Sequence, residues 1–367
     1  MLGANSRSPS AQVFNLVTAD GGTTWYGYEE MSNSPLYWTG FYAFGDNVSG
    51  VFGNNNETDA SGNDSLPGMT PIQAFQSSNI TKFGQFSGGN ENGLMVINEE
   101  DKTLWGVGLN DYGELGQNNK TTYSSPVQIP GTNWRSVFRG NNNVFATKTD
   151  GTLWSWGRNV HGSLGQSEGH NSSKSSPTQI GEGTDWAGGI RSMSASWGHA
   201  HVIKADGTMW SMGQNSKGQL GVNLSGTGFP SYENAQSSPK QVPGTTWATV
   251  SARGEWSIAT KTDGTLWAWG YNYNGELGQN NRTQYNSPVQ IPGTTWSAAV
   301  SGHTQAMYAV KTDGTLWGLG SISLKKADGS TNWNQFSSPV QIGSGTNWDT
   351  GDGRLIYSTS WAVVQSI

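Results

Sequence analysis

The chain has 367 residues, of which 33% are hydrophobic and 13% are charged, and its formal net charge is −6 at pH 7. The absence of cysteine excludes disulfides, thiolate catalysis and cysteine-ligated zinc or iron–sulfur sites. An acidic chain without basic clusters does not gather phosphate groups, so no nucleic-acid partner is expected.

Aromatic residues and glycine replace the usual aliphatic core. The chain contains 18 Trp, 12 Tyr, 11 Phe and 52 Gly. This composition is typical of short strands that pack through aromatic rings and are joined by tight turns, so we expect an all-β fold.

The N-terminal residues lack the apolar core of a secretion signal, and no run of 18 or more apolar residues occurs. We therefore expect a protein made in soluble form, without membrane insertion. Residues 1–9 are predicted to form an N-terminal tail, and residues 10–367 a single domain.

One phrase is repeated along the chain, and three copies read KTDGTLW, beginning at Lys148, Lys261 and Lys311. Copies recur about every 50 residues, a period that predicts propeller blades or solenoid units. The equivalent aromatic residues are Tyr42, Trp105, Trp154, Trp210, Trp267 and Trp317. We interpret the recurring tryptophans as packing wedges between neighbouring blades.

Two further markers accompany each repeat. A Gly-Thr-x-Trp corner ends at Trp25, Trp134, Trp186, Trp247, Trp296 and Trp348, with Phe83 standing in once. A Ser-Pro-x-Gln phrase contains Pro126, Pro177, Pro239, Pro288 and Pro339, with a weaker version at Pro71. Apolar residues alternate between these breakers and never keep a helical period, so each unit is predicted to form four strands.

In the best-defined unit the strands are expected at 134–137, 144–148, 153–157 and 176–180. Asp-Gly is predicted to occupy the two central positions of the hairpin between the second and third strands, where glycine permits positive φ. Proline at the start of the fourth strand places that strand at the outer edge of the sheet, because proline cannot donate to a ladder.

Seven corners but only six complete units occur along the chain. Residues 10–16 could supply a fourth strand that lacks its first three, and 355–357 and 361–364 are strand-like. We therefore expect a seven-bladed β-propeller, closed by N- and C-terminal strands that share one blade.

The pattern W…SGHTQAMYAVKTDGTLWGLG, together with WGRNVHGSLGQ and WGYNYNGELGQ, resembles the repeat of the regulator of chromosome condensation family. The resemblance extends from about Trp25 to Trp348, implies a seven-bladed propeller and suggests a bacterial or phage-type member. Residues 321–326 depart from the family's NxxGxLG loop, so the loop there is not predicted. Relatives include a nucleotide-exchange factor for a small GTPase and a β-lactamase inhibitor, but no functional residue carries over from them.

Specificity is expected where the repeats differ, which is in the loops after the first and the third strand of each unit. Antiparallel order places both loop sets on one face of the disc. Their Tyr, Trp, His and Asn content is typical of an interaction surface. The candidate binding residues are Tyr112, Asn142, Trp197, His199, Glu255, Trp256, Tyr273 and His303.

No catalytic residue, metal or cofactor is expected. His199 and His201 share one face of a strand, but no third ligand is evident nearby. Neither a nucleophile elbow nor a phosphate-binding loop occurs. An enzyme such as a polysaccharide lyase or hydrolase stays the alternative that a motif search would miss.

The leading hypothesis is a non-enzymatic scaffold, a virion structural or host-recognition protein. It would bind a protein or a cell-surface glycan, and other virion proteins could be partners. It would be found in the virion or outside cells after lysis, or in the cytoplasm if the protein is cellular. The alternative is a soluble regulator or inhibitor, exchange-factor-like or β-lactamase-inhibitor-like.

Overall fold

The computed structural model describes most of the chain between residues 83 and 346 and five short strands outside it. The described residues are 25–27, 41–44, 72–74, 83–89, 93–140, 142–169, 171–186, 188–196, 198–224, 234–301, 306–325, 331–346, 356–357 and 362–363.

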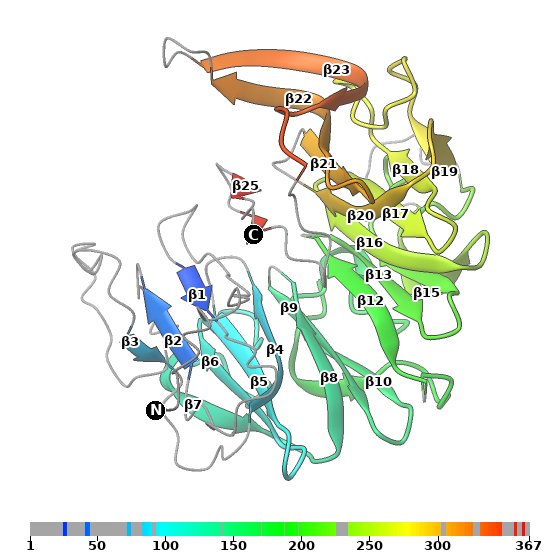
Figure 1. The fold of residues 1–367 in the computed structure, drawn as a ribbon. Helices are drawn as coiled ribbons and strands as arrows, with labels where there is room; N and C mark the ends of the chain where they lie inside the picture. The colour runs from blue at the N-terminus through cyan, green and yellow to red at the C-terminus, as the bar shows by residue number, and fades with distance from the viewer. Residues whose placement is uncertain are drawn as a thin grey trace, which may run out of the picture.

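Five antiparallel sheets, each of four strands taken consecutively along the chain, form the described body of the molecule (Figure 1). The first two contain β4 (Phe83–Gly89), β5 (Gly93–Asn98), β6 (Leu104–Gly108) and β7 (Tyr123–Ile129), then β8 (Trp134–Arg139), β9 (Asn143–Lys148), β10 (Leu153–Gly157) and β11 (Lys174–Gln179). The next two contain β12 (Ile190–Ala195), β13 (His199–Lys204), β14 (Met209–Gly213) and β15 (Gln236–Val242), then β16 (Trp247–Arg253), β17 (Trp256–Lys261), β18 (Leu266–Gly270) and β19 (Tyr285–Ile291). The fifth contains β20 (Trp296–Ser301), β21 (Ala306–Lys311), β22 (Leu316–Lys325) and β23 (Thr331–Gln341).

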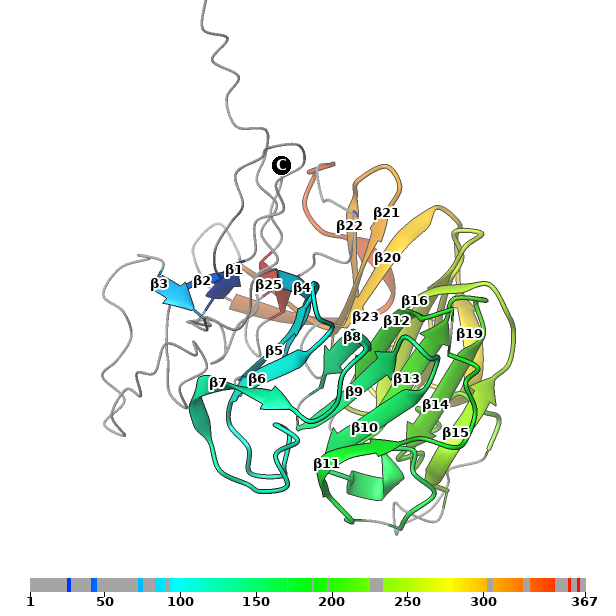
Figure 2. The same cartoon turned by 90° about the horizontal axis from the view of Figure 1, so that it is seen from below.

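The sheets are arranged as propeller blades. The first strands contact one another from sheet to sheet, β4 with β8, β8 with β12, β12 with β16 and β16 with β20. The fourth strands lie at the outside, as β7, β15 and β19 show in Figure 1, and Figure 2 shows consecutive sheets stacked face to face. The all-β fold, the four-strand unit and the outermost position of the fourth strand are thus confirmed.

The ends of the chain are described only in part. A three-stranded sheet contains β1 (Trp25–Gly27), β2 (Phe41–Phe44) and β3 (Ile72–Ala74). Tyr42 lies in β2, so the divergent first repeat has its third strand where the sequence predicts it. The strands β24 (Ile356–Tyr357) and β25 (Ala362–Val363) pair with each other. The strand expected in residues 10–16 and the corner at Trp348 lie outside the described residues. Seven blades and the shared closing blade therefore stay a prediction.

The KTDGTLW turn differs in one detail from the predicted geometry. The amide of Gly151 donates to the carbonyl of Lys148 (3.0 Å), so Thr149 and Asp150 occupy the central positions. Gly151 follows them with a φ of 86°. This is a three-residue hairpin loop, in which a turn is followed by a left-handed residue that forms a bulge. A glycine with positive φ is required, as expected, but Gly151 occupies the fourth position of the turn and not the predicted third.

The side chains of the phrase form a hydrogen-bonded relay. Asp150 Oδ1 accepts from the amide (3.0 Å) and the hydroxyl (2.7 Å) of Thr152. The hydroxyl of Thr152 in turn accepts from Trp154 Nε1 (2.7 Å). The hydrogen bonds from the Thr152 side chain and backbone hold the pKa of Asp150 below its usual value. The same relay recurs from Asp101, Asp206, Asp263 and Asp313.

The lysine of the phrase lies between two tryptophans. Lys148 Nζ is 4.8 Å from the ring centroid of the corner residue Trp134 and 4.3 Å from that of Trp154. An ammonium over an aromatic face is attracted by the ring quadrupole. Lys204, Lys261 and Lys311 repeat the arrangement in their own sheets.

The predicted wedge tryptophans do pack between sheets, but they are not the most deeply buried rings. Trp154 packs against a cluster in which Leu104 and Ile129 of one sheet meet Val144 and Trp156 of the next. Trp210, Trp267 and Trp317 pack in the same way. The fully buried rings include those of the corner and of the second aromatic position: Trp134, Trp156, Trp247 and Trp269.

The proline of the fourth strand does not start that strand. In β7 the register passes from Val127 opposite Gly106 to Tyr123 opposite Gly108, so three residues, including Pro126, face one residue of β6. The same irregularity occurs in the other four sheets. Because a bulge leaves residues unpaired, proline there removes no ladder hydrogen bond.

The bulge is where the preceding sheet docks. A Cβ added to Gly113, in the β6–β7 loop, would lie 2.4 Å from the Cα of Ser175 in β11. Beside this contact the amide of Asn118 donates to the carbonyl of Ser175 (2.6 Å). Three more glycine contacts of this kind join consecutive sheets, Gly162 with Ser237, Gly218 with Asn286 and Gly275 with Ser337. We call the interface between two consecutive sheets a seam.

The fifth sheet replaces the NxxGxLG loop with a long hairpin. β22 continues past Gly320, and its residues up to Lys325 pair with β23 as far as Thr331. The two strands project from the sheet as a ribbon (Figure 1). The base of the ribbon is tied to the preceding sheet, because Gln335 donates to Asn274 Oδ1 (2.9 Å) and accepts from Arg282 (2.8 Å).

The close approach at the seam predicts a difference between two glycine substitutions. Gly113→Ala places a methyl group against the Ser175 backbone at a positive φ of 87°, whereas Gly181→Ala has a φ of 64° and nothing within 4 Å. Both variants strain the backbone, but only Gly113→Ala forces the sheets apart, which should cost a further 1–3 kcal/mol or so of unfolding free energy. Denaturant unfolding measures both, and equal losses would show that the contact is not tight.

Candidate functional site

The two variable loop sets meet on one face, as predicted. The carbonyl of Asn142, in the β8–β9 loop, accepts from the amide of Arg158 in the β10–β11 loop (2.7 Å). The side chain of Asn142 donates to Glu114 Oε1 of the preceding sheet (3.2 Å). Similarly, the amide of Tyr271 donates to the carbonyl of Glu255 (2.9 Å). We call this side of the disc, formed by the loops after the first and third strands, the loop face.

The long loops of this face are internally braced. Asn110 Oδ1 accepts from the amide of Leu115 (2.8 Å), and Asn110 Nδ2 donates to the carbonyl of Thr121 (3.0 Å). The buried carboxylate of Glu114 accepts from the amide of Tyr112 (2.9 Å). Asn272 and Glu276 make the equivalent bonds in the β18–β19 loop. These loops therefore hold their side chains in fixed positions.

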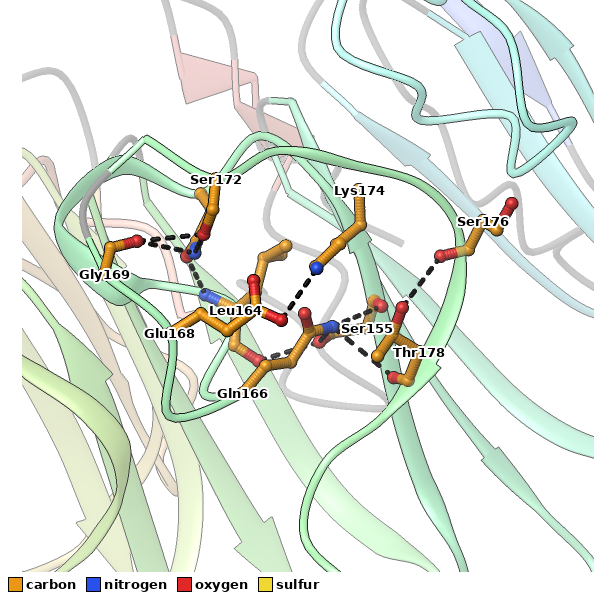
Figure 3. Close-up of polar contacts among 10 residues, drawn as sticks. Ser155, Leu164, Gln166, Glu168, Gly169, Ser172, Lys174, Ser176 and Thr178 are labelled. Atoms are coloured by element: carbon orange, nitrogen blue, oxygen red, sulfur yellow. Dashed lines mark hydrogen bonds and ion pairs between the residues drawn. The ribbon is translucent and has the colours of Figure 1, made fainter.

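Figure 3 shows the corresponding loop between β10 and β11. Gln166 Nε2 donates to both the carbonyl and the hydroxyl of Ser155 on β10 (2.8 Å each). The hydroxyl of Ser155 donates to the carbonyl of Leu164 (2.7 Å), and Lys174 pairs with Glu168 (2.7 Å). In this loop, too, the polar side chains are used to hold the loop against its own sheet.

Tyrosines and cations pair across two seams of the loop face. The guanidinium of Arg158 lies 4.6 Å from the ring centroid of Tyr112, on the preceding sheet. Further along, Lys217 Nζ lies 5.6 Å from the ring of Tyr271 on the following sheet, and Tyr271 stacks on Tyr273 (6.2 Å, interplanar angle 10°). We call these five residues the aromatic–cation row. Each cation–ring contact bridges a seam.

Tyr273 is the most accessible part of the row. Its side chain is 64% exposed, although its ring is aligned by Tyr271. Burial, together with the carboxylates of Glu255 and Glu276 and the nearby Tyr273, raises the pKa of Tyr271, so its hydroxyl stays protonated and can donate. An exposed ring held in place by its neighbour provides contact area at low entropic cost.

The predicted site residues divide into three groups. Tyr112, Asn142 and Glu255 are half-buried and Tyr273 is exposed, all on the loop face. Trp197 and His303 lie outside the described residues.

The remaining two, His199 and Trp256, are wrong as surface residues, since they are 0% and 1% exposed. They start β13 and β17, and their side chains point between the sheets, where Trp256 packs in the core with Leu277 and Trp296. The sequence places them next to loops but does not show that the strands begin so early.

His199 and His201 form a buried polar cluster instead of a binding site. Their Nε2 atoms lie 3.2 Å and 2.9 Å from the hydroxyl of Ser257 on the next sheet, and His201 Nε2 is 3.1 Å from the carbonyl of Gln219. Burial lowers the pKa of His201 to about 3 and that of His199 well below its usual value. The contacting oxygens are neutral, and the described residues contain no group of three metal-ligating side chains.

Arg158 and Lys217 are not among the binding residues that the sequence predicts. Each occupies a variable position in or beside an NxxGxLG loop. Aligning consecutive repeats would set each cation beside the tyrosine of the neighbouring unit, which is the signal that could have found them. Their position over the rings depends on the angle between blades, which the sequence does not give.

The part of the chain that the structure describes contains no helix of the length and apolarity required to span a membrane.

The contrast between Trp256 and Tyr273 can be tested by alanine substitution. Trp256→Ala should lower the unfolding free energy by about 3–5 kcal/mol, because it leaves a cavity between two sheets. Tyr273→Ala should change it by less than about 0.5 kcal/mol, since the side chain is largely exposed. Thermal and denaturant unfolding report both values, and a large loss for Tyr273→Ala would show that the ring serves the fold.

Comparison with known proteins agrees with this architecture. The regulator of chromosome condensation (RCC1) repeat matches residues 101–147, 150–203 and 263–308, and a second RCC1 repeat description matches residues 190–219. A human protein, the probable E3 ubiquitin-protein ligase HERC3, is 40% identical over 83 residues. That match covers 22% of this chain and only 7% of HERC3.

Solved structures with the same fold have low sequence identity. Human WBSCR16 is 16% identical with a TM-score of 0.70, and the match covers 95% of this chain and 86% of that one. Prp20p from Saccharomyces cerevisiae is also 16% identical, with a TM-score of 0.62 and coverage of 83% and 74%. Yeast RCC1 (Prp20) bound to Kap60 gives a TM-score of 0.59 at 16% identity, with coverage of 83% and 72%. The matched stretches are thus similar to RCC1 repeats, and the fold is that of an RCC1-like β-propeller.

Proposed function

We propose that this chain is a non-enzymatic protein-binding scaffold whose loop face contacts the partner. The observation that carries the proposal is the aromatic–cation row, whose residues pair across two seams of the loop face: Tyr112 with Arg158, and Lys217 with Tyr271 and Tyr273. Tyrosine and arginine are enriched among the residues that dominate binding energy at protein interfaces. The opposite face consists of short turns whose side chains are used in local hydrogen bonds.

Two solved structures of the same fold support a protein partner. One is yeast RCC1 (Prp20) bound to Kap60, and the other is Prp20p, which was described together with its binding properties to Gsp1p and histones. A rigid blade scaffold with braced loops also loses little freedom on binding, so more of the contact energy is expressed as affinity.

We further propose a role outside the producing cell, as a virion structural or host-recognition component. The support is compositional: few charges and many Gly, Trp and Tyr residues, together with polar loops, are features of adhesive surfaces. In this role the partner would be a host protein, a cell-surface glycan or another virion protein. If the chain is cellular, the same face would act in the cytoplasm.

The binding role predicts a specific pattern of loss. Tyr273→Ala and Arg158→Ala should each weaken partner capture about tenfold or more, because interface anchors of these types contribute above 1 kcal/mol. Arg135→Ala is the matched control, since Arg135 is an exposed arginine at the opposite end of β8. Quantitative capture from host extract by wild type and variants is the measurement. Capture that is the same for all four proteins would contradict binding through this face.

A soluble regulator or inhibitor is the second candidate, favoured by the fold shared with Prp20p. It predicts one stoichiometric soluble partner whose activity changes when the purified chain is added. A host-recognition protein should instead bind intact cells and leave soluble enzymes unaffected. Assay of captured proteins with and without the chain, beside a cell-binding assay, separates the two. Release of sugar ends from polymeric glycans would indicate the enzymatic alternative.

A further inference from the structure

The seam between the β12–β15 and β16–β19 sheets differs from the other described seams because it buries two imidazoles. His199 and His201 are both fully buried there, and their rings meet edge to face at 5.4 Å. Their Nε2 atoms converge on Ser257, which belongs to the opposite sheet. We propose that this seam is an acid-labile joint, which opens when the two histidines take up protons and thereby divides the aromatic–cation row.

The hydrogen bonds of the cluster suit neutral rings. The carbonyl of Gln219 accepts from Trp269 Nε1 (2.8 Å) and from the hydroxyl of Ser257 (3.0 Å), and His201 Nε2 approaches it to 3.1 Å. The Nδ1 atoms of His199 and His201 have no hydrogen-bond partner in the described structure. A second proton on either ring adds a charged N–H group to a cluster whose acceptors are already shared, and a buried donor without a partner is costly.

Among the described residues, no carboxylate shifts the pKa of His199 or His201. β17 brings the neutral Ser257, β18 the neutral Trp269, and the β14–β15 loop the neutral Gln219. That loop also carries Lys217, a cation. β16 ends at Arg253 and the β16–β17 turn carries Glu255, and these two residues have opposite charges. Among the described residues the electrostatic influence on His199 comes from His201, which would repel it once charged.

The direction of the pH dependence follows from the burial of the rings. Burial lowers the pKa of His201 from 6.5 to about 3, so the closed seam favours the neutral ring. Its stability is therefore complete above the unfolded pKa of 6.5 and is lost progressively as the pH falls toward 3. Between pH 7 and pH 4.5 linkage through His201 alone raises the opening equilibrium on the order of 50-fold.

Other contacts of the same seam do not titrate. Ser192 Oγ accepts from the amide of Val250 (3.2 Å), and Ser194 Oγ accepts from that of Ala252 (2.9 Å), along the first strands. The seam between the β4–β7 and β8–β11 sheets instead buries Glu114 near Arg139, two groups of opposite charge. Mild acid should therefore act on the histidine seam first.

Opening at this seam has a consequence for the loop face. Lys217 belongs to the β12–β15 side, and Tyr271 and Tyr273 belong to the β16–β19 side, so the contact of Lys217 with Tyr271 crosses the joint. Separation of the sheets would break the row and release a partner that spans it. This release rests on the proposed function, whereas the joint itself does not.

Hydrogen exchange of the protein alone, without any partner, tests the joint. After correction for intrinsic exchange, the amides that bond across this seam should exchange about 50-fold faster at pH 4.5 than at pH 7; they are those of Asn223, Trp247, Val250 and Ala252. The amides of Asn118 and Trp134, which bond across the seam between the first two sheets, should keep their protection. Uniform loss of protection across all sheets, or none in this window, would overturn the proposal, and this comparison needs only the wild-type chain.

Substitutions then assign the effect to the histidines. His201→Gln keeps an Nε2 donor toward Gln219 but cannot titrate, so it should reduce the acid effect to a few-fold. His161→Asn is the control, because His161 lies in another loop at a φ of 56° that asparagine tolerates. An unchanged acid response in His201→Gln, or its loss in His161→Asn, would contradict the assignment. A stable joint at pH 4.5 with intact partner capture would leave the binding proposal standing and remove only the switch.

Discussion

The structure depends on the close approach of backbone to backbone between consecutive blades. A glycine in each NxxGxLG loop reaches the bulged serine or asparagine of the next fourth strand, and no side chain fits between them. The backbone amide five residues after this glycine, such as that of Asn118 after Gly113, donates to the carbonyl of the bulged residue. One glycine and one proline-containing bulge per repeat thus position neighbouring sheets. The same contact supplies a hydrogen bond to a backbone carbonyl of the outer strand, which would otherwise be part of an open sheet edge.

A second link joins the sheets on the opposite face. The carbonyl of Gly151 accepts from the amide of the corner residue Trp186 of the next sheet (3.1 Å), and Gly207 and Gly264 do the same for Trp247 and Trp296. The KTDGTLW phrase therefore has two roles. Its Asp, Thr, Trp and Lys side chains brace one hairpin, while its glycine carbonyl connects that hairpin to the following sheet. This double use explains why the phrase is repeated almost without change.

Sequence periodicity was sufficient for the strand units, their order and the face on which the variable loops gather, because these follow from local patterns of turns and alternation. It was insufficient for side-chain positions that depend on the angle between sheets. His199 and Trp256 look like loop residues by position but point into a seam, and Arg158 and Lys217 become noticeable only once the neighbouring tyrosines lie beneath them. The position of Gly151 in its turn and of Pro126 in its bulge depended on register, which residue types alone do not fix.

The polar residues inside the seams differ even where the exposed turns have the same sequence. Glu114 lies near Arg139 in one seam, and His201 contacts Ser257 in another. In a third seam Glu276 accepts a hydrogen bond from Asn274, which in turn accepts one from Gln335 of the next sheet. Exchanging two units along the chain would bury a carboxylate without its donors or set an imidazole beside an arginine. The repeats are therefore not interchangeable parts, and the linear order of the gene is enforced by side chains that never reach the surface.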